Sequence, residues 1–461
     1  MGVKLSWESA VRSATARRSV LRKPALARRG RLLASHELLT CLLTLTLAGC
    51  GGDPLTIQHV VILFQENRSP DNLFHGLKNA DIADSGVNSK GEIIPLTPIP
   101  LDNRYDLNHT HEGFVKMYDG GKMDGADKIS CARHCPPHAQ FKYVYPSDVM
   151  PYLTLAEQYT FGDRMFQTNQ GPSFPAHQFI ISGTSAPTPD SDLFAAENIE
   201  GPFARGLSSF VESGCSGKGQ LVTLISPSGE ESQNVAPCFE HRTLMDLLDP
   251  QSISWRYYTT GSSWENVLWT APNAIRHLRF GADWQNVIPS PVQILVDIAN
   301  GQLPAVSWVV PSGQNSDHPG SNLGSGPSWV AAVVNAIGNS PYWSNTAIFI
   351  TWDDWGGWYD HVAPPMYNSY EYGFRVPLIV VSPYAKAHFV SHKMHDFGSI
   401  LRFIEENFSL PTLGYADSRA DDLSDCFDYT QLPLTFQTIA APLPRRYFLE
   451  DTTPPTPPDD D

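Results

Sequence analysis

The sequence reads IQHVVILFQENRSPD at residues 57–71, and this stretch decides the expected fold. Its first half is dominated by β-branched and other apolar residues, a composition typical of a buried strand in a parallel sheet. A similar run at residues 347–352 leads into DDWGGWYDH at residues 353–361. Polar side chains thus follow two expected strands at the point where each strand ends, and that edge of an open α/β sheet is where ligands bind.

The side chains that follow these two strands suit a divalent cation. Hard oxygen ligands would come from four residues: Glu66, Asn67, Asp353 and Asp354. Either segment alone is equally consistent with a helix-capping turn or a solvated acidic loop. Their joint position at two strand ends favours one metal site, although the pattern does not identify the metal.

Further apolar runs alternate with amphipathic patterns along the chain. We expect strands at residues 60–64, 179–182, 221–225, 305–310, 347–352 and 377–381, and helices at 241–248, 291–299, 328–337 and 397–408. This alternation predicts βαβ units, and therefore an α/β fold with a large, mostly parallel central sheet flanked by helices. The loop-rich segments 82–150 and 185–285 are expected to be insertions over the active site.

Composition limits the possible partners and the domain organisation. The 461 residues carry a formal net charge of −16, which argues against nucleic acid, because a phosphate backbone is bound by a Lys and Arg surface. The even spread of apolar residues favours one catalytic domain at residues 50–435. Residues 436–461 are Pro-rich and end in three aspartates, so we expect a disordered tail there.

The N-terminus has the layout of an export signal. A stretch rich in Arg and Lys precedes an apolar segment at residues 38–48, which is too short to span a membrane. The segment ends in LAGC, which resembles the bacterial lipobox. We expect residues 1–49 to be removed and Cys50 to carry a lipid anchor, giving a membrane-anchored lipoprotein of a bacterial cell envelope, or a secreted protein. The alternative is an ordinary signal peptide with an incidental cysteine.

Export would place the remaining cysteines in an oxidising compartment. Cys215 and Cys238 flank a loop rich in Gly and Ser and are expected to pair. Cys131 could pair with Cys135 or with Cys426, and one thiol is left over. A zinc site formed by Cys131, Cys135 and nearby histidines is the weaker alternative.

The motifs at both strand ends resemble those of a bacterial phosphoesterase family that contains secreted phospholipases C and acid phosphatases. The resemblance runs from ENRSxD at residues 66–71 through DDxGGxYDH at 353–361 to RFIE at 402–405. It implies a fold like that of alkaline phosphatases and sulfatases, and the hydrolysis of phosphate esters. The family usually has Phe where Pro70 stands, a departure that leaves the expected metal ligands unchanged.

Ser173 is the candidate nucleophile. It stands in NQGPSFP at residues 169–175, where a Gly-Pro turn ahead of an apolar strand would project its hydroxyl and let backbone N–H groups approach a phosphoryl oxygen. The alternative is a turn serine that bonds its own backbone. The family has Ser or Thr at this point, so the resemblance implies that Ser173 attacks phosphorus while bound to the metal.

His109 and His318 are the candidate histidines of the site. His109 closes DLNH at residues 106–109, and His318 stands in SDHP at residues 316–319. The family has active-site histidines in both segments, so the resemblance implies that they bind phosphoryl oxygens and that one protonates the leaving group. A weaker candidate is His361, which Asp360 could orient, and we expect structural roles for His111, His177 and His395.

These patterns predict an exported, metal-dependent phosphoric ester hydrolase that works through a phosphoserine intermediate. Activity of the phospholipase C type on phosphatidylcholine-like lipids is the first interpretation, and a broad-specificity acid phosphatase is the alternative. A sulfatase is disfavoured, because His177 stands where the sulfatase pattern has Arg. A metal-containing lipoprotein that only binds surfaces is the non-enzymatic alternative, against which the presence of Ser173 argues.

Overall fold

The computed structural model describes residues 57–132, 134–199, 214–216, 221–260, 269–320 and 322–454. The expected export signal and the expected lipid-attachment residue, Cys50, lie outside these ranges. Within them, no helix is both long enough and apolar enough to cross a membrane.

An eight-stranded sheet forms the centre of the fold, in the order β13-β12-β14-β1-β15-β16-β8-β17. Its strands are β1 (His59–Gln65), β8 (Thr160–Gly162), β12 (Trp255–Tyr258), β13 (Val287–Ile288), β14 (Val306–Val309), β15 (Thr346–Trp352), β16 (Leu378–Val381) and β17 (Phe389–Ser391). All neighbours are parallel except those of β16, which runs against both β15 and β8. The predicted α/β class and mostly parallel sheet are confirmed.

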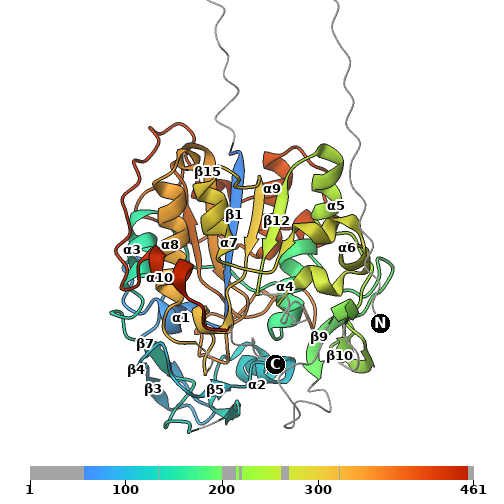
Figure 1. The fold of residues 1–461 in the computed structure, drawn as a ribbon. Helices are drawn as coiled ribbons and strands as arrows, with labels where there is room; N and C mark the ends of the chain where they lie inside the picture. The colour runs from blue at the N-terminus through green and yellow to red at the C-terminus, as the bar shows by residue number, and fades with distance from the viewer. Residues whose placement is uncertain are drawn as a thin grey trace, which may run out of the picture. The chain divides into compact units, whose positions relative to one another are not determined.

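The register of β1 and β15 aligns the two polar segments that follow them. These strands are parallel neighbours in the middle of the sheet (Figure 1), and Gln65 pairs with Trp352 at their last residues. Glu66 and Asp353 therefore leave the sheet side by side at the same edge.

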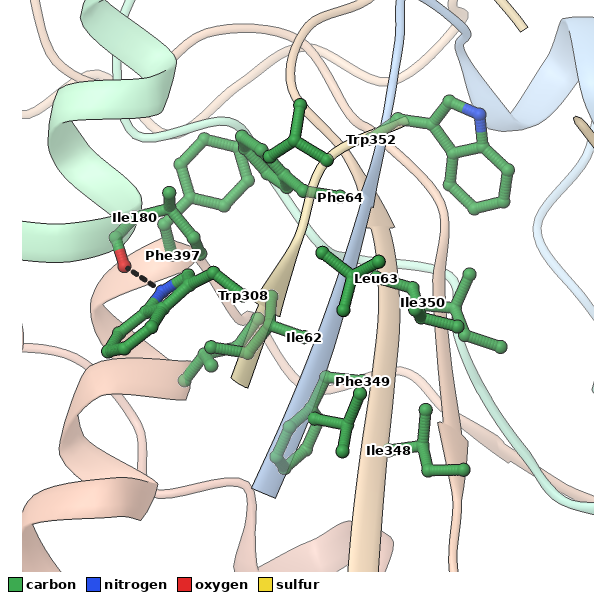
Figure 2. Packing of buried hydrophobic residues seen from close by; sticks show 14 of the residues in the cluster. Ile62, Leu63, Phe64, Ile180, Trp308, Ile348, Phe349, Ile350, Trp352 and Phe397 are labelled. Carbon is green, nitrogen blue, oxygen red and sulfur yellow. Dashed lines mark hydrogen bonds between the residues drawn. The ribbon is translucent and has the colours of Figure 1, made fainter. Parts of the chain in front are cut away.

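Helices cover both faces of the sheet. Figure 2 shows Phe64 and Trp308 pointing towards α4 (Ser173–Ser182) and α9 (Phe397–Asn407), and the Trp308 ring donates a hydrogen bond to the Ile180 carbonyl. Leu63 and Trp352 point to the opposite face. There, Trp352 packs edge-on against Tyr152 of α3 (Met150–Gln158), which contacts α8 (Gly326–Gly338). Because both faces are covered, the strands are apolar throughout.

The remaining helices are short and lie around this framework. They are α1 (Pro70–Leu73), α2 (His111–Tyr118), α5 (Met245–Leu248), α6 (Arg276–Phe280), α7 (Gln293–Ala299) and α10 (Arg445–Glu450). Helix α7 packs on α8, as does α10.

One strand prediction is wrong, and one predicted strand lies in a different sheet. Residues 179–182 belong to helix α4, which is buried along its whole length, so its apolar residues show no amphipathic period that separates a helix from a strand. Residues 221–225 do form a strand, β10 (Leu221–Ile225), but it lies in a separate sheet with β9 (Phe194–Ile199) and β11 (Glu231–Val235). The segment 185–285 is also more than an insertion, because it contributes β12 to the central sheet.

The segment 82–150 forms small sheets with a hydrophobic cluster of their own. The paired strands are β2 (Ser85–Val87) with β3 (Ile93–Pro95), β4 (Thr97–Ile99) with β7 (Lys142–Val144), and β5 (Asp106–Leu107) with β6 (Cys131–Ala132). Trp355 and Trp358, from the loop after β15, are buried in this cluster. The segment thus packs directly on the loop that carries the predicted aspartates.

The disulfides settle the choices that spacing left open. Cys215 pairs with Cys238, and Cys131 pairs with Cys135. Cys426 is a buried free thiol, so the Cys131–Cys426 alternative is wrong. The zinc site built on Cys131 and Cys135 is wrong as well, because both sulfurs are bonded to each other.

The prediction of a disordered tail from residue 436 is wrong for the residues that the structure describes. Ile439 and Phe448 are buried, and Phe448 packs edge-on against Trp329 of α8. Pro-rich composition limits regular structure, but a few apolar side chains are enough to dock such a segment on a helix.

Candidate active site

Asn67 occupies a strained position directly after β1. Its φ is +60°, the left-handed region that few residues other than glycine adopt. In this conformation its backbone N–H donates to Asp353 Oδ1 at 2.9 Å. The loop after β15 approaches closely because Gly356 has no side chain, and a Cβ there would lie 2.3 Å from the Asn67 carbonyl oxygen. Backbone strain of this kind is found at functional sites.

Asp354 connects the loop after β15 to the candidate nucleophile. Its Oδ1 accepts from the Gly356 N–H at 2.7 Å, and its Oδ2 accepts from Ser173 Oγ at 3.2 Å and from Asn67 Nδ2 at 3.4 Å. Burial, and then the neighbouring charge of Asp353, raise the pKa of Asp354 well above its usual range. A bound cation would offset the repulsion between the buried carboxylates of Asp353 and Asp354.

Ser173 is the first residue of α4, and its side chain is 3% exposed. The sequence predicts that it precedes a strand; it instead begins a helix, after the extended residue Pro172. The first N–H groups of a helix have no partner within the helix, and together with the helix dipole they favour an anion. The hydroxyl therefore lies between a carboxylate and a helix N-terminus.

His177 joins the carboxylates from the next turn of α4. Its Nε2 lies 3.1 Å from Glu66 Oε1 and 4.0 Å from Asp353 Oδ2. Burial lowers the pKa of His177 to about 4, although the charge of Asp353 opposes the shift. From the sequence we expected only a structural role for His177. Recognising α4 as a helix would have identified it, because residues four apart share one helical face.

His109 and His318 face each other across the same site, with ring centroids 6.0 Å apart. His109 Nδ1 donates to the Leu107 carbonyl at 2.7 Å, which leaves Nε2 to accept from Asn67 Nδ2 at 2.9 Å. His318 Nδ1 likewise donates to the Pro319 carbonyl at 2.7 Å. Both rings are fully buried and both are fixed by backbone carbonyls, so their Nε2 atoms have defined directions.

The donor set fits a divalent cation. Glu66, His177 and Asp353 each offer a ligand atom, and these three atoms lie within 4.8 Å of one another. Asn67 Oδ1 and Asp353 Oδ2 are buried, and neither accepts a hydrogen bond from the residues that the structure describes. Buried polar oxygens are ordinarily paired, so both atoms are suited to ligate an ion. The structure thus brings together all the residues that the sequence predicts for the metal and the chemistry: Glu66, Asn67, His109, Ser173, His318, Asp353 and Asp354.

The predicted pairing of Asp360 with His361 is wrong. His361 Nδ1 lies 2.8 Å from Asp71 Oδ2 and its Nε2 lies 3.0 Å from Asp81 Oδ1. Asp360 instead accepts from Arg375 Nε at 3.0 Å. These residues form a partly buried ion-pair network next to the site, and none of them bonds Ser173 or Asp354 in the part of the chain that is described.

Comparison with known proteins identifies a family and several relatives. Residues 57–411 match the Phosphoesterase family. Phospholipase C B of Mycobacterium tuberculosis is 23% identical over 452 residues, covering 83% of this chain and 80% of its own. Non-specific phospholipase C6 of Arabidopsis thaliana is 25% identical over 479 residues, covering 91% of this chain and 82% of its own. A protein of the alkaline phosphatase superfamily from Vibrio parahaemolyticus is structurally similar, with a TM-score of 0.36, 11% identity and coverage of 79% of this chain and 70% of that one.

Proposed function

This chain belongs to the Phosphoesterase family and is a phosphoric ester hydrolase, and from that premise we propose a metal-dependent enzyme that forms a phosphoserine at Ser173. The proposed substrates are phosphatidylcholine-type lipids, cleaved in the manner of a phospholipase C. The observation that carries the proposal is the 3.2 Å hydrogen bond from Ser173 Oγ to Asp354 Oδ2 at the start of α4.

The residues of the site divide the chemistry among them. Glu66, Asn67, Asp353 and Asp354 would hold the cation together with Ser173, and the ion would supply Lewis-acid stabilisation of the phosphoryl oxygens. His177, on α4, would offer a further ligand atom to the cation. The hydrogen bond to Asp354 fixes the Ser173 hydroxyl, so that a lone pair of Oγ would be free to attack phosphorus.

The reaction would proceed in two displacements. The Ser173 Oγ–P bond would form as the ester P–O bond breaks, and the Ser173 proton would pass to Asp354 Oδ2, which accepts its hydrogen bond. The leaving oxygen would take a proton from Nε2 of the doubly protonated His318 ring. Water would then attack phosphorus and give one proton to His318 Nε2. The Oγ–P bond would break, Ser173 Oγ would take back the proton held by Asp354, and the phosphorylated headgroup would leave. For a phosphomonoester, the second step would release inorganic phosphate.

The comparisons support the lipid substrate, because the relatives named above are phospholipases C. A phosphomonoesterase is the second candidate. It is favoured by the burial of the site, since Ser173 is 3% exposed and His318 is 1% exposed, which suits a small phosphate ester. The proposed location is the bacterial cell envelope, with the protein attached through a lipid anchor at Cys50.

One comparison tests the substrate class. Diacylglycerol released from phosphatidylcholine vesicles would be measured beside phosphate released from p-nitrophenyl phosphate, with the same purified enzyme and divalent metal. We expect diacylglycerol release to have the higher kcat/KM. Faster turnover of the monoester would favour the phosphomonoesterase, and no turnover of either would leave only the binding lipoprotein.

A further inference from the structure

Another cluster of side chains that could hold a metal ion lies outside the active-site network. His395 stands between β17 and α9, while Asp425 and Cys426 belong to the short 3-10 helix η10 (Ser424–Cys426). Their ligand atoms converge. His395 Nε2 lies 3.9 Å from Cys426 Sγ and 3.5 Å from Asp425 Oδ1, and the sulfur lies 3.8 Å from the same carboxylate oxygen.

These separations match those of a tetrahedral zinc ion. Zinc binds sulfur at about 2.3 Å and nitrogen or oxygen at about 2.0–2.1 Å, so tetrahedral angles place the ligand atoms about 3.3–3.5 Å apart. The three distances in this cluster are longer by at most about half an ångström. Small rotations of the Asp425 and Cys426 side chains would close that difference.

A carboxylate orients the ring of His395. His395 Nδ1 lies 2.7 Å from Asp421 Oδ1 and donates to it, and Nε2 lies 3.1 Å from Ser391 Oγ. In the neutral ring with the proton on Nδ1, Nε2 offers a lone pair. Asp421 is itself positioned by the Leu423 N–H and by an ion pair with Lys393. A carboxylate that holds the far nitrogen of a histidine is the usual support of a histidine ligand in metal sites. The contact between Asp421 and His395 is independent of the convergence of the three ligand atoms.

Cys426 completes a donor set of one nitrogen, one oxygen and one sulfur. Both other described pairs of cysteines form disulfides, whereas Cys426 stays a free thiol. A thiolate excludes magnesium and calcium as preferred ions and favours zinc. Asp425 is partly exposed, which leaves a route for an ion from solvent.

We propose that His395, Asp425 and Cys426 form a zinc-binding site that is separate from the catalytic metal. Binding would transfer the thiol proton of Cys426 to solvent, leaving a thiolate on the ion, with Ser391 or solvent at the fourth position. The ion would tie the segment before α9 to η10 and would therefore stabilise the folded state. Without an ion, the cluster is held by hydrogen bonds, including one from Ser391 Oγ to Asp425.

Cobalt(II) tests this site in the full-length protein. Metal-free enzyme would be titrated with Co²⁺ in excess Mg²⁺, so that the hard-oxygen site is occupied and only a thiolate ligand produces a sulfur-to-cobalt charge-transfer band. We expect one equivalent of this band in the wild type and none in Cys426→Ala. Phosphate ester hydrolysis by Cys426→Ala should remain within about twofold of wild type, because the site is separate from the catalytic residues.

Two further variants separate metal binding from folding. Asp425→Asn should weaken Co²⁺ binding at least about tenfold. The matched control is Asp422→Asn, which removes a neighbouring carboxylate that bonds Ser424 rather than the three proposed ligands and should keep the full band. In the wild type, stoichiometric Zn²⁺ should slow alkylation of Cys426 at least about tenfold, as followed by mass spectrometry of its peptide. An unchanged band in Cys426→Ala, or alkylation insensitive to Zn²⁺, would overturn the proposal.

Discussion

Ser173 and His177 lie one turn apart on α4 and engage different members of the same group of carboxylates. Ser173 Oγ donates to Asp354, while His177 Nε2 lies beside Glu66 and Asp353. A single helix therefore places both the candidate nucleophile and a candidate metal ligand. The rotation and position of α4 relative to the ends of β1 and β15 determine whether the site can form.

Replacing Ser173 by Ala should remove the nucleophile and leave the metal-binding carboxylates in place. We expect kcat to fall by at least about two orders of magnitude with metal binding nearly unchanged. Acid quenching of the wild type during turnover, followed by peptide mass spectrometry, should find one phosphate on Ser173. The control is Ser182→Ala, at the other end of α4, which should keep near wild-type kcat. Retention of more than about a tenth of the activity in Ser173→Ala would show direct attack by water.

Replacing Asp353 by Ala should leave a folded protein with little bound metal. The variant loses a buried ligand of the candidate cation site, so we expect a loss of about two orders of magnitude in turnover. Metal content after dialysis, measured by elemental analysis, checks this directly. A matched control is Asp81→Asn, a partly exposed carboxylate of the neighbouring ion-pair network. Wild-type metal content in Asp353→Ala would reject the assignment.

His177→Gln tests whether His177, for which we expected only a structural role from the sequence, is a metal ligand. Gln keeps a hydrogen-bond donor towards Glu66 but loses the imidazole, so metal affinity should fall about 10- to 100-fold. Isothermal titration with Mn²⁺ would measure the change. The control is His111→Gln. The native His111 side chain bonds Glu231, so this substitution should leave the metal affinity unaltered. Equal affinities in the two variants would return His177 to a purely structural role.

Gly356→Ala should destabilise the protein through both strain and collision. The residue has a φ of +63°, and its Cβ would lie 2.3 Å from the Asn67 carbonyl oxygen, so we expect a loss of about 3 kcal/mol in the free energy of unfolding. Gly91→Ala is the matched control, because its φ is +77° but nothing lies within 4 Å of the added atom. That variant should lose about 1 kcal/mol in urea unfolding. Similar losses of unfolding free energy in Gly356→Ala and Gly91→Ala would mean that the loop after β15 shifts to accommodate the methyl group.

His361 should make stability depend on pH above neutrality. Burial opposes its protonation, but the hydrogen bond and charge of Asp71 outweigh burial and raise the pKa of His361 to about 9 from 6.5. Its stabilising contribution is therefore complete below about pH 6.5 and is lost as the pH rises through about 9. In His361→Gln, urea unfolding at pH 6 and pH 9 should show a smaller difference than in the wild type. An equal difference would assign the pH dependence to other groups.

Much of the site could be predicted because it is encoded locally. The polar residues after β1 and β15 follow directly from apolar runs, and the parallel pairing of these strands brings Glu66 and Asp353 together. Helix α4 could not be recognised in this way. Its face towards the sheet and its outer face are both buried. Its apolar residues therefore follow neither the period of 3.6 expected of an amphipathic helix nor the period of 2 expected of a half-buried strand.

Other misses came from tertiary packing. Phe448 packs on Trp329 of α8, which lies more than 100 residues earlier in the chain, so no local pattern encodes this contact. The partners of His361 also come from distant segments, and its nearest charged neighbour in the sequence, Asp360, is taken by Arg375 instead. Long-range competition between ion pairs cannot be resolved from spacing alone.

The position of β1 between β14 and β15 has a consequence for biosynthesis. Strand β1 is the earliest described element of the chain, yet its partners begin at Val306 and Thr346. During synthesis, an emerging chain therefore holds Glu66 and Asn67 long before Asp353 and Asp354 exist. A nascent or truncated chain that ends before β15 carries only half of the cation site. The site can therefore form only after β15 has been synthesised and has paired with β1.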